Sequence, residues 1–188
     1  MTGDYSRMRL ESDLPVRGDF YVNVRNVHTN DVIRRYTIKN MIVGSGFAAV
    51  IRFLNDGNQD GIVTSLRPGV GARNAETWEG ALGGETPDTG DTNIAGPIIK
   101  NGQQVYWDLP IQKEPIISSN TYQLKITATL DGGELTDSFN GVTVKEAGLF
   151  LANGDLFSRQ IHPAVEKTSD IAIDYEWRIS LRSTAPSV

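Results

Sequence analysis

Apolar and polar positions alternate along most of the C-terminal half of the chain. Clusters of Gly, Pro, Asn and Asp interrupt the alternation, for example at residues 131–133 (DGG), 139–141 (FNG) and 153–155 (NGD). Alternation is typical of strands with one buried face, and the clusters are typical of turns. Strands are therefore predicted at residues 103–109, 121–130, 142–151, 156–162 and 171–181.

The N-terminal half predicts a hairpin followed by one helix. Residues 20–27 (FYVNVRNV) and 32–39 (VIRRYTIK) read as two strands joined by the turn residues 28–31 (HTND). Asn40 is a candidate helix N-cap, and apolar residues at helical spacing place the firm part of the helix at 46–55. A short strand is expected at 62–66.

These elements predict a mainly β protein: an antiparallel, jelly-roll-like β-sandwich with one short helix and a long glycine-rich loop. The long, acidic stretch from 69 to 96 is that loop, and connections of this length are usually functional. Residues 1–19 mix charge with Gly and Pro without a clear period, so they are expected to form an arm. The expected organisation is an arm at 1–19, one domain at 20–182 and a tail at 183–188.

Composition and charge narrow the possible functions. The chain has 188 residues, a net charge of -5 and a pI near 5.0, which argues against non-specific nucleic-acid binding. It contains no cysteine, so disulfides, thiol catalysis and cysteine metal sites are excluded. No run of about 18 apolar residues or signal-peptide pattern appears, so neither a membrane partner nor secretion by a signal peptide is expected.

The strongest local motif is DGNQDG at residues 56–61. Asp56, Asn58 and Asp60 occupy the first, third and fifth positions of a calcium loop, where side-chain oxygens bind the ion. The twelfth position is Arg67, where such a loop needs a bidentate Glu. An ordinary turn between helix and strand is therefore favoured, with a calcium site as the alternative and no other cofactor expected.

Three residues are candidates for an interface. Trp78 lies in the acidic loop, where it is either an anchor for a partner or a contact with its own domain. Arg17 opens the adhesion tripeptide RGD, although a chance match in a turn is the simpler interpretation. Phe150 shares a strand face with Glu146 and Gly148, so a second sheet or a neighbouring subunit is expected to cover that face.

Catalytic chemistry has little support in the sequence. The two histidines, His28 and His162, lie in separate elements without zinc-ligand spacing, and no nucleophile motif such as GxSxG is present. Carboxylates in the acidic loop are expected to serve solubility, and a carboxylate pair for glycoside hydrolysis is the less favoured alternative. Arg159 and Lys167 are expected to pair with Glu146 as exposed ion pairs of small energetic effect. The chain is not predicted to be an enzyme.

Several segments resemble small virion structural proteins of tailed bacteriophages. The resemblance rests on KEAGLF at 145–150, GDLFSR at 154–159, IHP at 161–163, KT at 167–168 and DYEWRI at 174–179. Upstream it includes YTIKNMIV at 36–43, GF at 46–47, and DTGDT at 88–92 with Ile94 and Pro97. It covers residues 32–181 in pieces and identifies a virion part better than it distinguishes head, neck or tail.

This resemblance implies a role in assembly rather than catalysis. The function it favours is a capsid decoration (cement) protein that binds and stabilises the assembled shell. A tail, collar or baseplate component is the first alternative, and a carbohydrate- or receptor-binding β-sandwich module is the second alternative. The implied partners are the major capsid protein or tail proteins, in a homo-oligomer with a trimer favoured. The implied location is the virion, assembled in the host cytoplasm.

Overall fold

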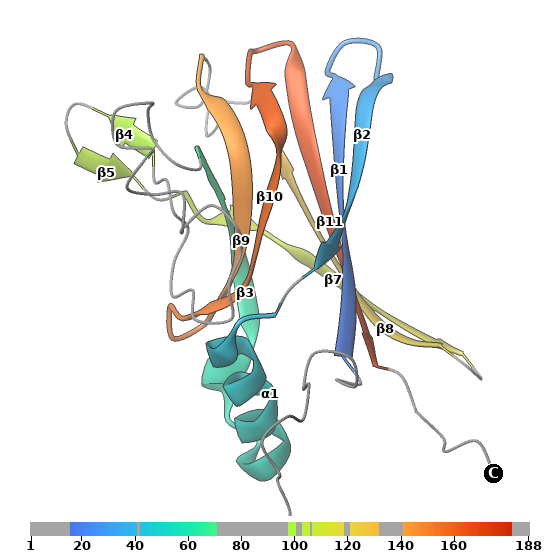
Figure 1. The fold of residues 1–188 in the computed structure, drawn as a ribbon, viewed down its shortest axis with the longest axis vertical. Helices are drawn as coiled ribbons and strands as arrows, with labels where there is room; N and C mark the ends of the chain where they lie inside the picture. The colour runs from blue at the N-terminus through green and yellow to red at the C-terminus, as the bar shows by residue number, and fades with distance from the viewer. Residues whose placement is uncertain are drawn as a thin grey trace, which may run out of the picture.

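Two antiparallel sheets pack face to face in the computed structural model, with one short helix at one end (Figure 1). The structure describes residues 16–40, 42–70, 98–100, 103–105, 107–118, 121–131 and 141–181. The predicted mainly β fold with a single short helix is confirmed, and the two sheets are consistent with a β-sandwich. The jelly-roll detail stays a prediction, and the predicted glycine-rich loop lies almost entirely outside the described residues.

The larger sheet, sheet A, has five strands. Their order is β2 (Val32–Asn40), β1 (Val16–Asn26), β11 (Ile171–Leu181), β8 (Thr121–Leu130) and β7 (Gln112–Ser118). Every pair in it is antiparallel, and the first residue of β1, Val16, pairs with the last residue of β11, Leu181. The chain therefore enters and leaves sheet A at adjacent positions.

The smaller sheet, sheet B, has four strands. Their order is β10 (Leu156–Glu166), β9 (Thr143–Leu151), β3 (Val63–Gly69) and β6 (Leu109–Pro110). A separate hairpin pairs β4 (Ile98–Lys100) with β5 (Gln103–Val105). The helix α1 (Gly44–Asp56) and a single 3-10 turn (Gln59–Gly61) connect β2 to β3.

Some predicted bounds need correction. Residues 16–19, assigned to the arm, are the first residues of β1, and the predicted strand 103–109 is two short strands, β5 and β6. Strand β7 was not predicted because its sequence, QKEPIIS, lacks clear alternation and contains Pro115. Strand β10 continues past Pro163 to Glu166. Both strands are sheet edges, where proline is tolerated because no neighbour needs its missing N–H.

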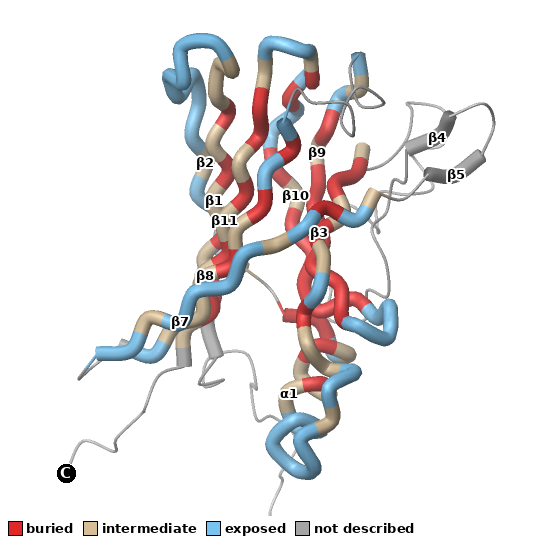
Figure 2. Tube along the Cα trace, turned by 180° about the vertical axis from the view of Figure 1, so that it is seen from behind, coloured by how far each residue is buried: buried red, intermediate tan, exposed pale blue. Residues whose placement is uncertain are grey.

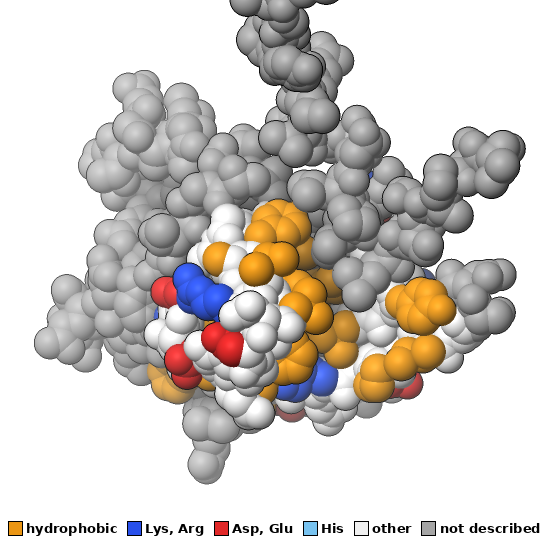
Figure 3. Space-filling model, turned by 90° about the horizontal axis from the view of Figure 1, so that it is seen from below, with side chains coloured by type: hydrophobic (Ala, Val, Ile, Leu, Met, Phe, Trp, Pro, Cys, Tyr) orange, Lys and Arg blue, Asp and Glu red, His pale blue; other side chains and the backbone are white. Residues whose placement is uncertain are grey.

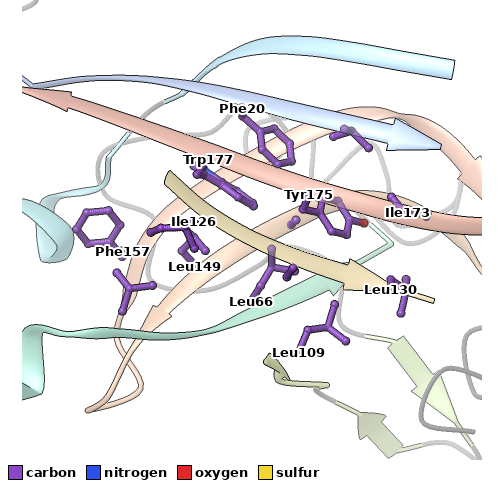
Figure 4. Close-up of a cluster of buried hydrophobic side chains, with 14 of the residues drawn as sticks. Phe20, Leu66, Leu109, Ile126, Leu130, Leu149, Phe157, Ile173, Tyr175 and Trp177 are labelled. Carbon is purple, nitrogen blue, oxygen red and sulfur yellow. The ribbon is translucent and has the colours of Figure 1, made fainter. Parts of the chain in front are cut away.

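The core lies between the sheets and is built largely by the alternating residues of the central strands (Figure 4). Phe20 and Trp177 are fully buried, with ring centroids 4.0 Å apart. Leu149 of β9 faces them from sheet B, and its neighbour Ala147 lies on the same face. Figure 2 shows that the strand centres are buried, whereas the hairpin tips at one end and the end of α1 at the other are exposed.

Helix α1 begins after Val43, not after Asn40. Val43 is the N-cap and has no side-chain cap, whereas Asn40 is the last residue of β2, so the predicted capping role of Asn40 is wrong. The helix ends at Gly57, whose φ of 69° is left-handed and suits glycine. Gly46 lies so close to the carbonyl oxygen of Phe157 in β10 that a Cβ would overlap it. This close approach holds the start of α1 against sheet B.

Asn40 lies where the chain crosses from sheet A to sheet B. Its Oδ1 accepts hydrogen bonds from Trp177 Nε1 at 3.1 Å and from Ser158 Oγ at 2.6 Å. Trp177 belongs to sheet A and Ser158 to sheet B. One amide side chain therefore connects β2, β11 and β10 within the interior.

Candidate interaction surface

Exposed apolar side chains gather on the C-terminal half of α1. Ile51 is 65% exposed and Leu54 is 73% exposed, while the ring of Phe53 is half exposed. The buried positions of the helix, Gly46 and Ala49, lie nearer its start. The end of α1 thus projects beyond the sheet that its first turns cover, as Figure 1 shows.

A second apolar area lies at the end of the β7–β8 pair. Ile117 is 74% exposed and Tyr122 is 48% exposed, and the two residues are directly paired across the strands. Tyr122 lies four residues from Ile126 along β8, so it lies on the face of sheet A that lines the core. The core-facing side of sheet A therefore continues as an apolar surface beyond its buried part.

We call the two areas together the apolar end, comprising Ile51, Phe53, Leu54, Ile117 and Tyr122. Figure 3 views the molecule from this end and shows hydrophobic side chains gathered over it. Single exposed apolar residues are ordinary, but several large ones at one end are typical of a surface that contacts another protein. This arrangement can bind a partner by burial of apolar area, and exposed charged residues such as Arg52 and Asp56 lie beside it in α1.

Several side chains on the outer face of sheet B, which points away from the core between the sheets, are also buried. Glu146 Oε2 and Arg159 Nε form an ion pair at 2.9 Å in which both side chains are at most 1% exposed. The prediction of a Glu146–Arg159 pair is therefore correct, but the prediction that it is exposed is wrong. Phe150, a predicted interface residue, is also buried, in a cluster with Val43 and Leu156. Phe150 packs inside this chain and offers no free surface.

Two titratable groups with strongly shifted pKa values lie in the core. Burial lowers the pKa of His162 to about 4, with a smaller opposing effect from its hydrogen bond to the Pro163 carbonyl. Burial also raises the pKa of Tyr175 far above its ordinary range, and the nearby Glu146 adds to that shift. Their rings are 5.8 Å apart, and neither His162 Nε2 nor the Tyr175 hydroxyl has a hydrogen-bond partner among the described residues. Packing in the core encloses both groups.

The predicted calcium loop forms a turn in the structure. Asp56 Oδ1 accepts a hydrogen bond from the backbone N–H of Asn58, and Asn58 Oδ1 accepts one from Asp60. These contacts organise the chain between α1 and β3. Within the described ranges, no group of three or more His, Asp or Glu residues is placed to hold a metal. Calcium binding by Asp56, Asn58 and Asp60 stays a prediction.

The other predicted site residues are not brought together. The tripeptide beginning at Arg17 lies within β1, between β2 and β11, and its Gly18 is buried. Trp78 lies outside the described residues, as do the carboxylates of the acidic loop. His28 contacts Asp170 at 3.1 Å on the surface, whereas His162 is buried in the core.

The sequence reasoning missed the apolar end, although part of its signal was present. Ile51 and Leu54 lie three residues apart, which places them on one helix face, but helical spacing alone does not show whether that face is covered. Ile117 lies on the strand that was not predicted. No helix in the described part of the chain has the length and hydropathy needed to span a membrane.

Comparisons with protein-family models, with curated proteins and with solved structures give no match to this chain. The apolar end and the sequence resemblance are therefore the two observations from which a function can be proposed.

Proposed function

We propose that this chain is a non-enzymatic structural protein of a tailed-phage particle, a capsid decoration protein that binds the assembled shell. The observation that carries the proposal is the apolar end. An exposed surface that includes Ile51, Leu54 and Ile117 suits contact with a neighbouring protein better than it suits contact with water.

The residues that carry the resemblance support this interpretation through their positions. Glu146, Leu149 and Phe150 from the KEAGLF segment are buried, as are Phe157 and Arg159 from the GDLFSR segment and Trp177 from the DYEWRI segment. A shared pattern of buried residues describes a shared scaffold rather than a shared catalytic site. Exposed residues would then make the contact with a partner, and these residues can differ from one phage particle to another without changing the scaffold.

The non-enzymatic part of the proposal rests on where the reactive groups lie. The two groups with large pKa shifts, His162 and Tyr175, are 3% and 1% exposed. Shifted pKa values often mark active sites, but here desolvation in a packed core is the main cause of both shifts. These groups are therefore better explained as parts of the core than as catalysts.

A binding experiment with particles tests the proposal. Purified protein is mixed with phage heads or tails that lack it, and the bound fraction is measured after sedimentation. The test variant, Ile51→Ser/Leu54→Ser, removes apolar area from an exposed helix face and leaves the core intact. Arg52→Ser on the same helix is the matched control, since Arg52 is exposed but not apolar.

We expect the wild type and Arg52→Ser to bind heads, and the double variant to bind at least about tenfold more weakly. Density for the protein on the head surface in a particle reconstruction would provide the direct location. Binding to tails alone would replace the decoration role with the tail, collar or baseplate alternative. Binding to neither structure would overturn the proposal.

A further inference from the structure

Strand β2 forms an open margin of sheet A. Within the described part of the chain β2 pairs only with β1, and Figure 1 places it at the border of the sheet. The opposite margin, β7, carries Pro115, which has no backbone N–H to donate. Strand β2 has nine residues and no proline. An open edge of this length can accept a further strand by backbone hydrogen bonds.

The two faces of β2 differ in chemistry. Tyr36 and Ile38 pair with the buried residues Val22 and Phe20, and both are half-buried against the core. Arg35 and Lys39 alternate with them, so they lie on the outer face, where both are exposed. A strand added beside β2 would meet Tyr36 and Ile38 on the core side, with Arg34 at the turn end of that side. It would meet Arg35 and Lys39 on the outer side.

The charge of β2 is of one sign. It contains Arg34, Arg35 and Lys39 and no acidic residue. No hydrogen bond or ion pair to another described residue engages the Arg34 guanidinium. Arg35 donates to the amide oxygen of Asn23, which carries no charge. Lys39 contacts Asp19 at 3.2 Å, but the Lys39 side chain is 94% exposed, so this pair contributes little.

Cations on an edge strand also prevent two copies of a protein from joining edge to edge. A second copy of β2 would bring a second set of the same three cations beside the first, and like charges across a strand pair repel. The same cations attract an acidic strand. The charge of β2 therefore favours an acidic strand as its partner and disfavours a second copy of β2.

We propose that β2 binds an extended segment of alternating acidic and apolar residues, which becomes the sixth strand of sheet A. The apolar side chains of that segment pack beside Tyr36 and Ile38, and its carboxylates lie beside Arg35 and Lys39. Arg34, next to the hairpin turn, takes a further carboxylate at the end of the segment. This inference does not depend on the role in a phage particle.

The probe for this proposal is a fluorescein-labelled nonapeptide of alternating Glu and Val, and its counterpart of alternating Lys and Val is the control peptide. Binding is measured by fluorescence anisotropy with the full chain at two salt concentrations. The test variant is Arg34→Glu/Arg35→Glu. The matched control is Arg52→Glu/Lys125→Glu, which changes the net charge equally at exposed or part-exposed positions away from β2.

We expect the Glu/Val peptide alone to bind, more weakly at high salt, and about tenfold more weakly to the β2 variant than to its control. Bound peptide should also slow amide hydrogen exchange within Val32–Asn40. Near-ultraviolet circular dichroism checks the fold, and Arg34→Gln/Arg35→Gln replaces a variant that fails to fold. Equal binding of both peptides, equal losses in both variants, or no added protection in β2 would overturn the proposal. Dimerisation through β2 in place of peptide binding would also overturn it.

Discussion

The indole nitrogen of Trp177 donates a hydrogen bond to the side-chain oxygen of Asn40 across 3.1 Å of buried space. The same oxygen accepts the hydroxyl of Ser158 from the other sheet. Because Trp177 and Ser158 are both fully buried, each loses water on folding and depends on Asn40 for this hydrogen bond. The crossing point between the sheets is therefore a polar junction within an apolar interior.

Replacing Asn40 by Ala should lower the free energy of unfolding by about 2–4 kcal/mol, because it removes a common acceptor from two buried donors. Urea denaturation followed by tryptophan fluorescence measures the change. Thr37→Ala, an exposed position on the same strand, should change the free energy of unfolding by less than about 0.5 kcal/mol. Similar values for both variants would show that the junction contributes nothing specific.

A second prediction concerns the contact between α1 and β10. Gly46→Ala should destabilise the protein by about 1–3 kcal/mol, although alanine is the better helix former. The reason is steric: a Cβ at Gly46 would overlap the Phe157 carbonyl oxygen and lie 2.8 Å from Cγ2 of Ile42. Thermal unfolding measures the effect. Gly57→Asn should cost little, because no atom lies within 4 Å and Asn tolerates the left-handed conformation.

The buried ion pair provides a third test. Glu146→Gln should lower the free energy of unfolding by about 3–5 kcal/mol, because it removes the negative charge 2.9 Å from the buried guanidinium of Arg159. The comparison is Glu114→Gln, which breaks a pair with Lys125 in which Glu114 is largely exposed, and this change should cost at most about 1 kcal/mol. Chemical denaturation at neutral pH gives both values. A Glu146→Gln effect as small as the Glu114→Gln effect would show that the buried pair is not needed for stability.

The fourth prediction is a loss of stability in mild acid. The pKa of His162 falls from 6.5 to about 4 on burial, so the unfolded chain takes up the proton first. The contribution of neutral His162 to the free energy of unfolding is fully present above pH 6.5 and is lost as the pH falls to about 4. Below pH 4, His162 is protonated in both the folded and the unfolded chain. The total loss is about 3 kcal/mol.

His162→Gln should flatten the dependence of the urea midpoint on pH between 6.5 and 4. Burial acts to raise the pKa of Asp108, but hydrogen bonds from Arg67 and Ser65, together with the charge of Arg67, lower that pKa overall. Its contribution to stability is lost only as the pH falls below its ordinary value of 3.8, which separates it from His162. A midpoint that falls equally in the wild type and His162→Gln would assign the acid sensitivity to other groups.

The strands with clear alternation could be predicted well from the sequence. The bounds of β8 and β11 match the predicted segments 121–130 and 171–181, because both strands have a regular buried face. The missed strand β7 lies at an edge, where one side of the strand has no partner and the pattern is weak. Local pattern thus predicts central strands better than edges.

Burial of polar residues was harder to predict. Glu146 and Arg159 have the charges of surface residues, and only the packing of the folded chain shows that they lie inside it. Asn40 has a side chain that is common at helix N-caps, but in the fold its oxygen accepts a hydrogen bond from Trp177, which is distant in sequence. The apolar end was missed for a related reason: sequence shows which residues are apolar but not which of them the fold leaves uncovered.

The pairing of Val16 with Leu181 has a practical consequence for protein engineering. Paired residues of antiparallel strands lie about 5 Å apart, so the two ends of the folded core are neighbours. A short linker joining them would allow a circular permutant with new termini in the exposed β9–β10 turn at Asn153 and Gly154. That turn lies on the α1 side of the molecule, where Ala152 donates a hydrogen bond to the Ile62 carbonyl, so the permutant would present a fused tag or probe close to the apolar end.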